Sequence, residues 1–549
     1  MIVPETIVEV LAGLRQDIIE RRIRSGFERL DQNADLLNCF DPAAPNAAQL
    51  LWRVAQWVDV GWRGAAVVQA ALVAMSRQAR SRLSLRDYVA IRMAEGLVSM
   101  SGEDADDAIA HFDSVLAFEK DIDDPELLAI ANFWKARCQR KKGEYDDALT
   151  HAIKARDIAV DCGFDRMAAV MRVLESWLCF QKGRYKEAVK ILTETEAVLR
   201  NTDDAVVLGN IQSTYGRIYR QEGRYDRAVE HFTAAIEEYR KVDRQHPHLV
   251  RTLANMAYVK RVVAVDFQRK LDAESARRKH GTVRDVAASS SQAQYRDQFE
   301  RVRNEAFAEL DEAAIICGVH PNHRGAGTVH LNRGLLHLDS GSLDLAEEQA
   351  AQAFALGEEK QDHILMARAR LLQSIVENAK VDEGIEGDPR RHAQAALDYI
   401  RDAIELARST QNRRLLARVH TWHGLILSNE YFNDLEAATH AMNSANSFLD
   451  HGYRDTAWED LRTLKARVVK SQSVNDKLRA WSHGDVGSRT FQQLEEEFAE
   501  IIIPKVWERE GRKISRVATK LSISPKKIRR ALSRAGLLRG KTGPASTAE

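Results

Sequence analysis

The pattern of apolar and polar positions along the chain is that of amphipathic helices. Near the start, Leu11, Leu14, Ile18 and Ile19 stand at helical spacing. Residues 491–502 carry a second stripe of this kind, with glutamates on the remaining positions. Only 10 prolines and an aromatic content of 7% also favour helix. The pattern predicts an all-α protein, and 549 residues exceed what one hydrophobic core supports, so several domains or an open-ended array are expected.

A unit of forty residues repeats along the chain. Its clearest mark is Gly-x-Tyr-x-x-Ala, which occurs at steps of forty residues at Gly143–Ala148, Gly183–Ala188 and Gly223–Ala228, with a related copy at Gly341–Ala346. A small residue stands twelve positions before the alanine of each copy, including an earlier one at Ala108: Gly96, Ala136, Ser176, Gly216 and Gly334. Small residues let two antiparallel helices approach closely. One such pair cannot bury its own apolar stripe, so neighbouring pairs must stack.

These residues resemble the tetratricopeptide repeat, most completely from Gly223 to Ala235. The period departs from the family's value of about 34 residues. Longer helices are therefore implied, similar to the repeats of large bacterial signal-regulated activators such as the maltose-regulon activator. The resemblance extends with gaps from Leu51 to Val469, with weaker copies around Ala66, around Ala396 and after Gly424. It implies a right-handed superhelical array of antiparallel helix pairs.

Breaks in the pattern predict the domain boundaries. Residues 1–50 are expected to form a helical cap, 51–269 a first lobe and 298–470 a second lobe. Between the lobes, 270–297 has few apolar and many small polar residues, which predicts a flexible insertion. The Ser-, Gly- and Asp-rich segment 471–490 is predicted to be a linker, 491–540 a separate module and 541–549 a disordered tail.

Residues 511–537 predict two short helices joined by a tight turn. Ser515 and Ser524 suit helix N-caps, and Pro504 and Pro525 each suit the first position of a helix. The predicted core of this module is Val517, Ala518, Leu521, Ile523, Ile528, Leu532 and Leu537. Two short helices of which the second is rich in cations are the usual device for placing a helix in the DNA major groove.

This segment resembles the Fis-type helix-turn-helix that ends many bacterial enhancer-binding activators. The resemblance rests on Ala518-x-x-Leu521-x-Ile523-Ser524 followed by Ile528-Arg-Arg-x-Leu532. Ser522 replaces the glycine usual in the turn, and Pro525 stands where the family often has a polar reader. Ser524, Lys527 and Arg529 thus remain as candidates for base contact. The predicted DNA-binding set is Ser524, Lys526, Lys527, Arg529, Arg530 and Arg534.

The helix before this motif is the candidate for self-association. Residues 501–503 are apolar around too much of the helix for a one-sided contact. Either this helix is sandwiched within the module or it meets a second copy of itself. The Fis-type resemblance implies the second arrangement, a homodimer, for which Phe498, Ile501 and Ile502 are the candidate residues.

The net charge of zero hides an asymmetry. From Lys505 to Glu549 the chain holds thirteen Lys and Arg against three Glu, so the remaining residues carry the opposite charge of ten. A basic end on an acidic body is typical of a modular nucleic-acid binder. Five scattered cysteines, and the absence of a signal peptide or an apolar run long enough to span a membrane, predict a cytoplasmic protein.

Two apparent sites are better explained otherwise. The Gly540-Lys541-Thr542 run lacks the glycine that a phosphate-binding loop needs five positions earlier, where Ala535 stands. Cys317, His320 and His323, with His330 and His337 downstream, have metal-ligand spacing but fit a loop and a repeat helix. No catalytic arrangement emerges, so no enzyme activity, no cofactor and no metal are expected.

The sequence therefore predicts a DNA-binding transcription regulator whose array senses or docks a protein or peptide. The first helix of each pair is expected to line the inner face, including Arg217, Arg220, Arg333 and His337, where basic residues would favour an acidic peptide. The alternative is a non-enzymatic scaffold or adaptor of a multi-protein assembly, such as a defence or secretion system, whose basic end contacts RNA or protein.

Overall fold

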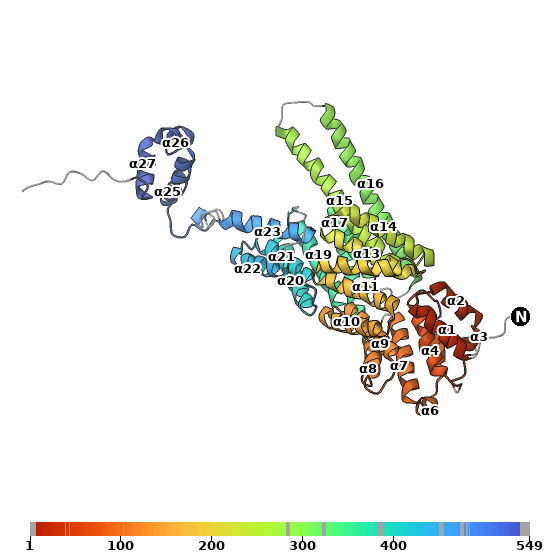
Figure 1. The fold of residues 1–549 in the computed structure, drawn as a ribbon. Coiled ribbons are helices and arrows are strands. Elements are labelled where there is room, and N and C mark those ends of the chain that lie inside the picture. Colours follow the sequence, from red (N-terminus) through yellow and green to blue (C-terminus); the bar gives the residue numbers. More distant parts are fainter. Residues whose placement is uncertain are drawn as a thin grey trace, which may run out of the picture. The chain divides into compact units, whose positions relative to one another are not determined.

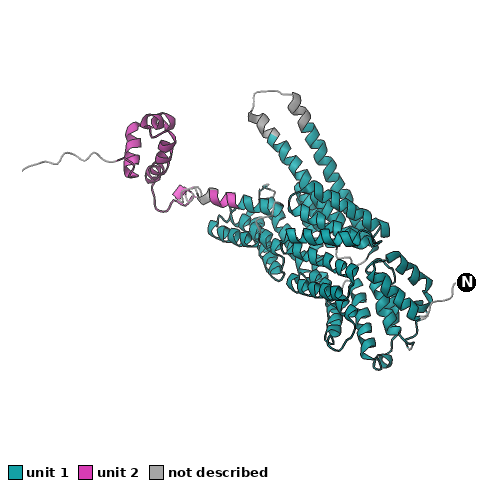
Figure 2. Ribbon diagram, in the orientation of Figure 1, with its two compact units in different colours: residues 1–464 teal, residues 465–549 magenta. Residues whose placement is uncertain are grey.

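The computed structural model describes residues 7–38, 40–42, 44–102, 104–280, 286–320, 325–382, 384, 388–449, 455–472, 477–478, 481 and 484–538. Over these residues the elements are helices, with no strand. The chain divides into two compact units, residues 1–464 and 465–549 (Figure 2). The predicted tail, 541–549, lies outside the described residues, as does part of the predicted linker.

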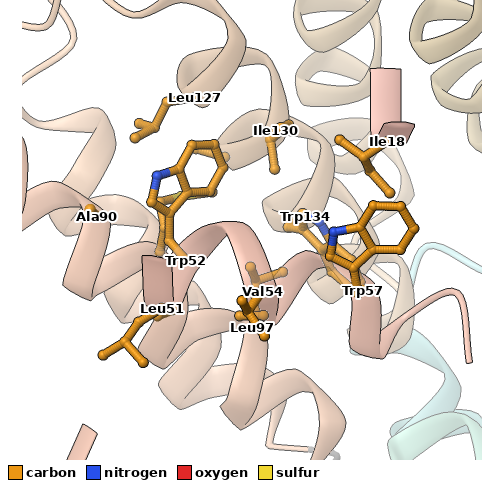
Figure 3. Close-up of a cluster of buried hydrophobic side chains, with 14 of the residues drawn as sticks. Ile18, Leu51, Trp52, Val54, Trp57, Ala90, Leu97, Leu127, Ile130 and Trp134 are labelled. Atoms are coloured by element: carbon orange, nitrogen blue, oxygen red, sulfur yellow. The ribbon is translucent and has the colours of Figure 1, made fainter. Parts of the chain in front are cut away.

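The N-terminal part of the first unit is a cluster of short helices. Their bounds are α1 Ile7–Ile19, α2 Ile23–Gln32, α3 Asp35–Asn38, α4 Ala47–Ala55, the 3-10 turn η1 Gln56–Val58, α5 Ala65–Ala74 and α6 Arg77–Arg80. Every residue of α4 is buried, including Trp52, and Trp57 follows in η1. Both indoles lie among aliphatic side chains of α1, α7 and α9, including Ile18, Leu97 and Ile130 (Figure 3). This core joins the predicted cap to the first repeats.

Successive antiparallel helix pairs make up the rest of the first unit (Figure 1). Their bounds are α7 Leu85–Ser101, α8 Ala105–Leu116, α9 Pro125–Lys142, α10 Tyr145–Asp161, α11 Asp165–Gln181, α12 Tyr185–Leu199, α13 Ala205–Gln221, α14 Tyr225–Val242, α15 Pro247–His280, α16 Val286–Val319, α17 Ala326–Asp339, α18 Leu343–Glu359, α19 His363–Asp382, α20 Pro389–Arg408, α21 Arg413–Leu427 and α22 Leu435–Phe448. A last helix, α23 Thr456–Gln472, follows the pairs and continues past the end of the first unit at residue 464. The predicted all-α superhelical repeat array is confirmed.

The repeat motif acts as predicted. Gly143 and Gly223 end α9 and α13 with φ of 87° and 73°, a left-handed conformation that glycine adopts without strain. At Gly216 a Cβ would lie 2.7 Å from the ring of Phe232, so glycine is what lets α13 and α14 approach this closely. Gly96 and Phe112 repeat the arrangement between α7 and α8, again at 2.7 Å.

The segment between the predicted lobes differs from the expectation of a flexible insertion over 270–297. α15 continues to His280 and α16 begins at Val286, while 281–285 lie outside the described residues. The two helices pack against one another and extend beyond their neighbours in the array (Figure 1). No repeat motif marks these helices, because a long helix pair needs only a shared contact face, such as that between Phe267 and Tyr295, whose rings stack at 6.4 Å.

The array turns far enough for distant segments to meet. Gln411, before α21, donates its backbone N–H to the carbonyl of Gly143 at 3.3 Å. In return, the side-chain oxygen of Gln411 accepts the backbone N–H of Asp146 at 2.6 Å. Tyr258 of α15 likewise bonds Thr456 of α23 at 2.7 Å. Contacts between residues up to 268 positions apart (Gly143 and Gln411) place the inner faces of early and late helices opposite one another.

The second unit contains α25 Phe491–Arg509, α26 Ile514–Leu521 and α27 Pro525–Arg534. Ile503, Val517, Ile528, Ala531 and Leu532 are its buried core. Ser524 caps α27 by accepting the N–H of Lys527 at 3.3 Å, as predicted, and Ser522 holds the turn with φ of 52°.

Three local predictions for this unit are corrected. Pro504 lies inside α25 and starts no new helix, because residues on both sides of it, Ile503 and Trp507, pack in the same core and hold the helix together. The N-cap of α26 is Lys513, so Ser515 is already helical. Leu537, predicted to be core, is 42% exposed because it follows the end of α27.

Candidate ligand-binding cavity and C-terminal basic helix

A cavity of about 240 Å³ lies on the inner face of the array and is lined by basic side chains. We call it the arginine cavity. Its cations come from α9, α13, α15, α19 and α21: Arg140, Lys141, Arg217, Arg220, Arg251, Arg368, Arg414 and Arg418. Asp362 is its one carboxylate among the described lining residues. The first helices of the pairs therefore supply most of the lining, as the sequence predicted.

The guanidinium groups of this cavity are crowded against one another. Burial, together with neighbouring arginines, lowers the pKa of Arg140 to about 9 and that of Arg217 to about 10. Arg220 and Arg368 are lowered to about 10 in the same way. Like charges held together out of water disfavour the protonated state, so this cluster has an excess of positive charge that an anion would relieve.

Several of these arginines also have unused hydrogen-bonding capacity. The Nε–H groups of Arg140, Arg217, Arg220 and Arg418 are buried and find no acceptor among the described residues. Because a buried donor without an acceptor costs free energy, a ligand bearing oxygen acceptors would be stabilised here.

Aromatic rings, and the carboxylate of Asp455 outside the cavity lining, hold part of the arginine cluster in place. Arg140 lies over the ring of Trp177 at 4.8 Å, and Arg220 lies over Tyr258 at 5.2 Å. Burial lowers the pKa of Arg414, but Asp455, which accepts from its Nε at 2.8 Å, outweighs that effect and raises it. The excess positive charge also acts on Tyr258. Burial raises the pKa of this tyrosine, but Arg418, Arg414 and Arg261 lower it by more, so that its pKa lies below the ordinary value.

The four residues predicted to bind a partner separate into two pairs. Arg217 and Arg220 line the arginine cavity. Arg333 instead forms an ion pair with Asp311 of α16, and His337 lies 5.3 Å from the ring of Phe307, also on α16. Relative to the small residue of their own helix, Arg217 and Arg220 stand at +1 and +4, whereas Arg333 and His337 stand at −1 and +3. That offset rotates a side chain around the helix and away from the inner face.

The sequence carried a signal for one of the residues that the prediction missed. Arg140 stands at +4 from Ala136, the position that Arg220 has from Gly216. Arg368, Arg414 and Arg418 lie in the first halves of their helices and share no such register. Only the curvature of the array brings them opposite Arg140 and Arg217.

The predicted DNA-binding residues occupy one face of α27 and its N-cap, and several of them have acidic partners. Lys527 pairs with Glu495 at 2.6 Å, and Arg534 pairs with Glu496 at 2.9 Å and with Glu500 at 3.1 Å. Arg530 lies 3.7 Å from Glu496. Ser524, Lys526 and Arg529 are exposed.

The predicted dimerisation residues lie on α25. Phe498 is 49% exposed, and Ile501 and Ile502 are half-buried, while Ile503 alone of the isoleucine run is fully buried in the core of the unit. Phe491, two turns before Phe498 on the same helix, is 83% exposed. One residue of the apolar run therefore fills the core of the unit, and its neighbours remain accessible.

The described residues contain no group of three or more His, Cys, Asp and Glu side chains that could hold a metal ion. His320 instead bonds the backbone carbonyl of Gln245 at 2.7 Å, and His323 lies outside the described residues. Among the described helices, none is long and apolar enough to cross a membrane.

Comparisons with known proteins agree with the repeat architecture. A tetratricopeptide repeat model matches residues 216–245, which include the end of α13 and all of α14. No curated protein sequence matches the chain.

Solved structures with similar helical arrays include a monomeric mutant of IFIT1 with m7Gppp-AAAA, at 13% identity and TM-score 0.45, covering 85% of this chain and 91% of that one. The apo quorum sensor NprR from B. thuringiensis has 14% identity and TM-score 0.45, covering 72% of this chain and 98% of that one. A Rap protein complexed with competence and sporulation factor has 12% identity and TM-score 0.46, with the same two coverages.

Proposed function

We propose that the array binds an acidic segment of a peptide or protein in the arginine cavity, and that the second unit binds duplex DNA, so that the chain is a transcription regulator responsive to its partner. The observation that carries the first half is the cluster of crowded arginines with buried, unpaired Nε–H groups. Carboxylates accept such donors and supply the missing negative charge.

Basic residues of the second unit support its DNA-binding role. Lys526 and Arg529 stand exposed at the start of α27, next to the capped N-terminus at Ser524. Cations in this position contact phosphates and fix the helix in the groove, while the residues nearest the N-terminus contact base edges. Exposed Phe491 and Phe498 on α25 support a homodimer.

A second candidate function is a scaffold without DNA binding, in which the second unit docks a protein. The pairing of Lys527 and Arg534 with the glutamates of α25 favours it, because those cations already have counter-ions within their own unit.

Two measurements on the full-length protein test these functions. A fluorescently labelled acidic peptide pool should bind, and Arg217→Ala with Arg220→Ala should weaken that binding, whereas Arg227→Ala, an exposed arginine paired with Glu230, should leave it unchanged. Equal binding by all variants would contradict the cavity assignment.

A mobility-shift assay on genomic duplex fragments separates the regulator from the scaffold. The regulator gives a salt-sensitive shift that is lost when Lys527, Arg529 and Arg530 are replaced by alanine. The scaffold gives no shift at low ionic strength. Sedimentation of Ile502→Asp beside the unaltered chain tests the dimer, since a charge on that face should yield monomers.

A further inference from the structure

A second cavity, of about 480 Å³, adjoins the arginine cavity. The two share five lining residues, Arg140, Lys141, Trp177, Arg217 and Arg251, so they lie next to one another with these side chains between them. Apolar side chains make up about half of the lining of the second cavity, among them Val58, Trp62, Phe133, Trp134, Val170 and Leu174. We call it the apolar cavity. Its volume lies within the range of about 300–1,000 Å³ typical of ligand sites.

The two cavities differ in their charge balance. Each carboxylate that lines the apolar cavity has an arginine partner: Asp59 pairs with Arg137 at 2.5 Å, Asp204 with Arg21 at 2.7 Å and Asp243 with Arg63. The excess of positive charge therefore begins at the shared wall, with Arg140 and Arg217, and continues into the arginine cavity.

We infer that the two cavities together hold one short peptide segment, with acidic groups at one end in the arginine cavity and two or more bulky apolar side chains in the apolar cavity. This inference rests on the proposed peptide-binding function and adds the apolar requirement. A purely acidic segment would leave the apolar cavity filled with water, while burial of apolar side chains there stabilises the complex.

Amide and hydroxyl groups on the same walls suit a peptide backbone. Asn210, Ser213 and Thr214 line the apolar cavity, and Asn255 and Asn332 line the arginine cavity. The Oδ1 of Asn332 is buried and has no donor among the described residues, so it is available to a peptide N–H. A side-chain amide offers both a donor and an acceptor, as a peptide group does.

The charge balance argues against a nucleic acid in the same space. A nucleic acid carries a phosphate on every nucleotide. Nucleotides beyond the first would place their phosphates beside Asp59, Asp204 and Asp243, whose arginines are already engaged. A peptide with charge at one end only needs no further cation in the apolar cavity.

Fluorescence polarisation with the full-length protein and labelled hexapeptide pools tests the inference. One pool has two Asp or Glu at one end and Val, Leu or Phe elsewhere; a second replaces the apolar positions with Gly and Ser; a third keeps the apolar positions and has no acid and an amidated end. Each acidic pool is made with the acids at either terminus. We expect the first pool to bind at least about tenfold more tightly than either other pool, a difference of about 1.4 kcal/mol.

A matched pair of variants assigns that difference to the apolar cavity. Val170→Asp places a charge on a half-buried lining position of α11 and should reduce the first pool to the affinity of the purely acidic one. Val198→Asp on α12 alters a valine that is 43% exposed and lines neither cavity, and it should leave binding unchanged. Thermal melting of both variants confirms that each is folded.

The outcomes separate this inference from the function on which it rests. Equal affinity for the first and second pools, with no effect of Val170→Asp, overturns the apolar requirement and leaves the acidic-peptide function intact. Failure of every pool to bind removes both. Tighter binding of single-stranded RNA hexamers than of the first pool, with dependence on Arg217, replaces the peptide by a nucleic acid.

Discussion

The arginine cavity and the second unit both contain clusters of cations, but these cations differ in whether an acidic side chain pairs with them. In the cavity, Arg140 and Arg217 face other arginines and keep buried donors unpaired. On α27, Lys527 and Arg534 are exposed and paired with glutamates of α25. Crowding leaves positive charge uncompensated in the cavity, whereas the glutamates of α25 compensate the cations of the second unit.

The largest expected effect is a charge reversal in the cavity. Arg217→Glu should weaken acidic-peptide binding about 100-fold, because it removes a cation and adds a carboxylate facing the ligand. The same reversal at the exposed Arg227, on α14, should change affinity little. Titration by fluorescence polarisation measures both, and similar losses in the two variants would show that the effect is a general one of net charge.

The next prediction compares the unpaired and the paired cations of the second unit. Combined replacement of Lys526 and Arg529 by alanine should weaken duplex binding about tenfold and reduce the slope of log affinity against log salt by roughly one for each residue. Replacing Lys527 and Arg534, which have glutamate partners, should have a smaller effect. Filter binding over a range of salt concentrations gives the slopes. If the paired residues have the larger effect, the ion pairs with α25 do not persist on DNA.

A smaller effect concerns stability of the free protein. Arg217→Met should raise the unfolding free energy by about 1 kcal/mol, because an apolar side chain replaces a partly buried cation with like-charged neighbours. In scanning fluorimetry without peptide or polyvalent anions, the midpoint should rise by about 2 °C. A lower midpoint would mean that Arg217 stabilises the array itself.

The smallest effect comes from removing one counter-ion. Arg534, as hydrogen-bond donor, is the main cause that lowers the pKa of Glu496, so this glutamate is charged at neutral pH and competes with DNA for Arg534. Glu496→Gln should therefore increase duplex affinity by about twofold, the scale of an exposed ion pair. Glu508→Gln, on the same helix but without an ion-pair partner among the described residues, serves as the control in the same assay.

The repeat, and the local structure that follows from it, could be read from the amino-acid sequence alone. The glycines before α10, α12, α14 and α18, and the small residues facing Phe112 and Phe232, are local requirements of one helix pair, so the repeat motif predicts them. The cap at Ser524 and the core of α26 and α27 are equally local.

Only the tertiary structure decided which arginines share a cavity and which helices continue through a break in the pattern. Arg140 and Arg418 are far apart in sequence, and the curvature accumulated over many helix pairs brings them together. Small rotations between pairs add up, and no single repeat encodes their sum. Packing also decided the continuity of α25 through Pro504 and of α15 and α16, because contacts with the neighbouring helices outweigh local signals for a break.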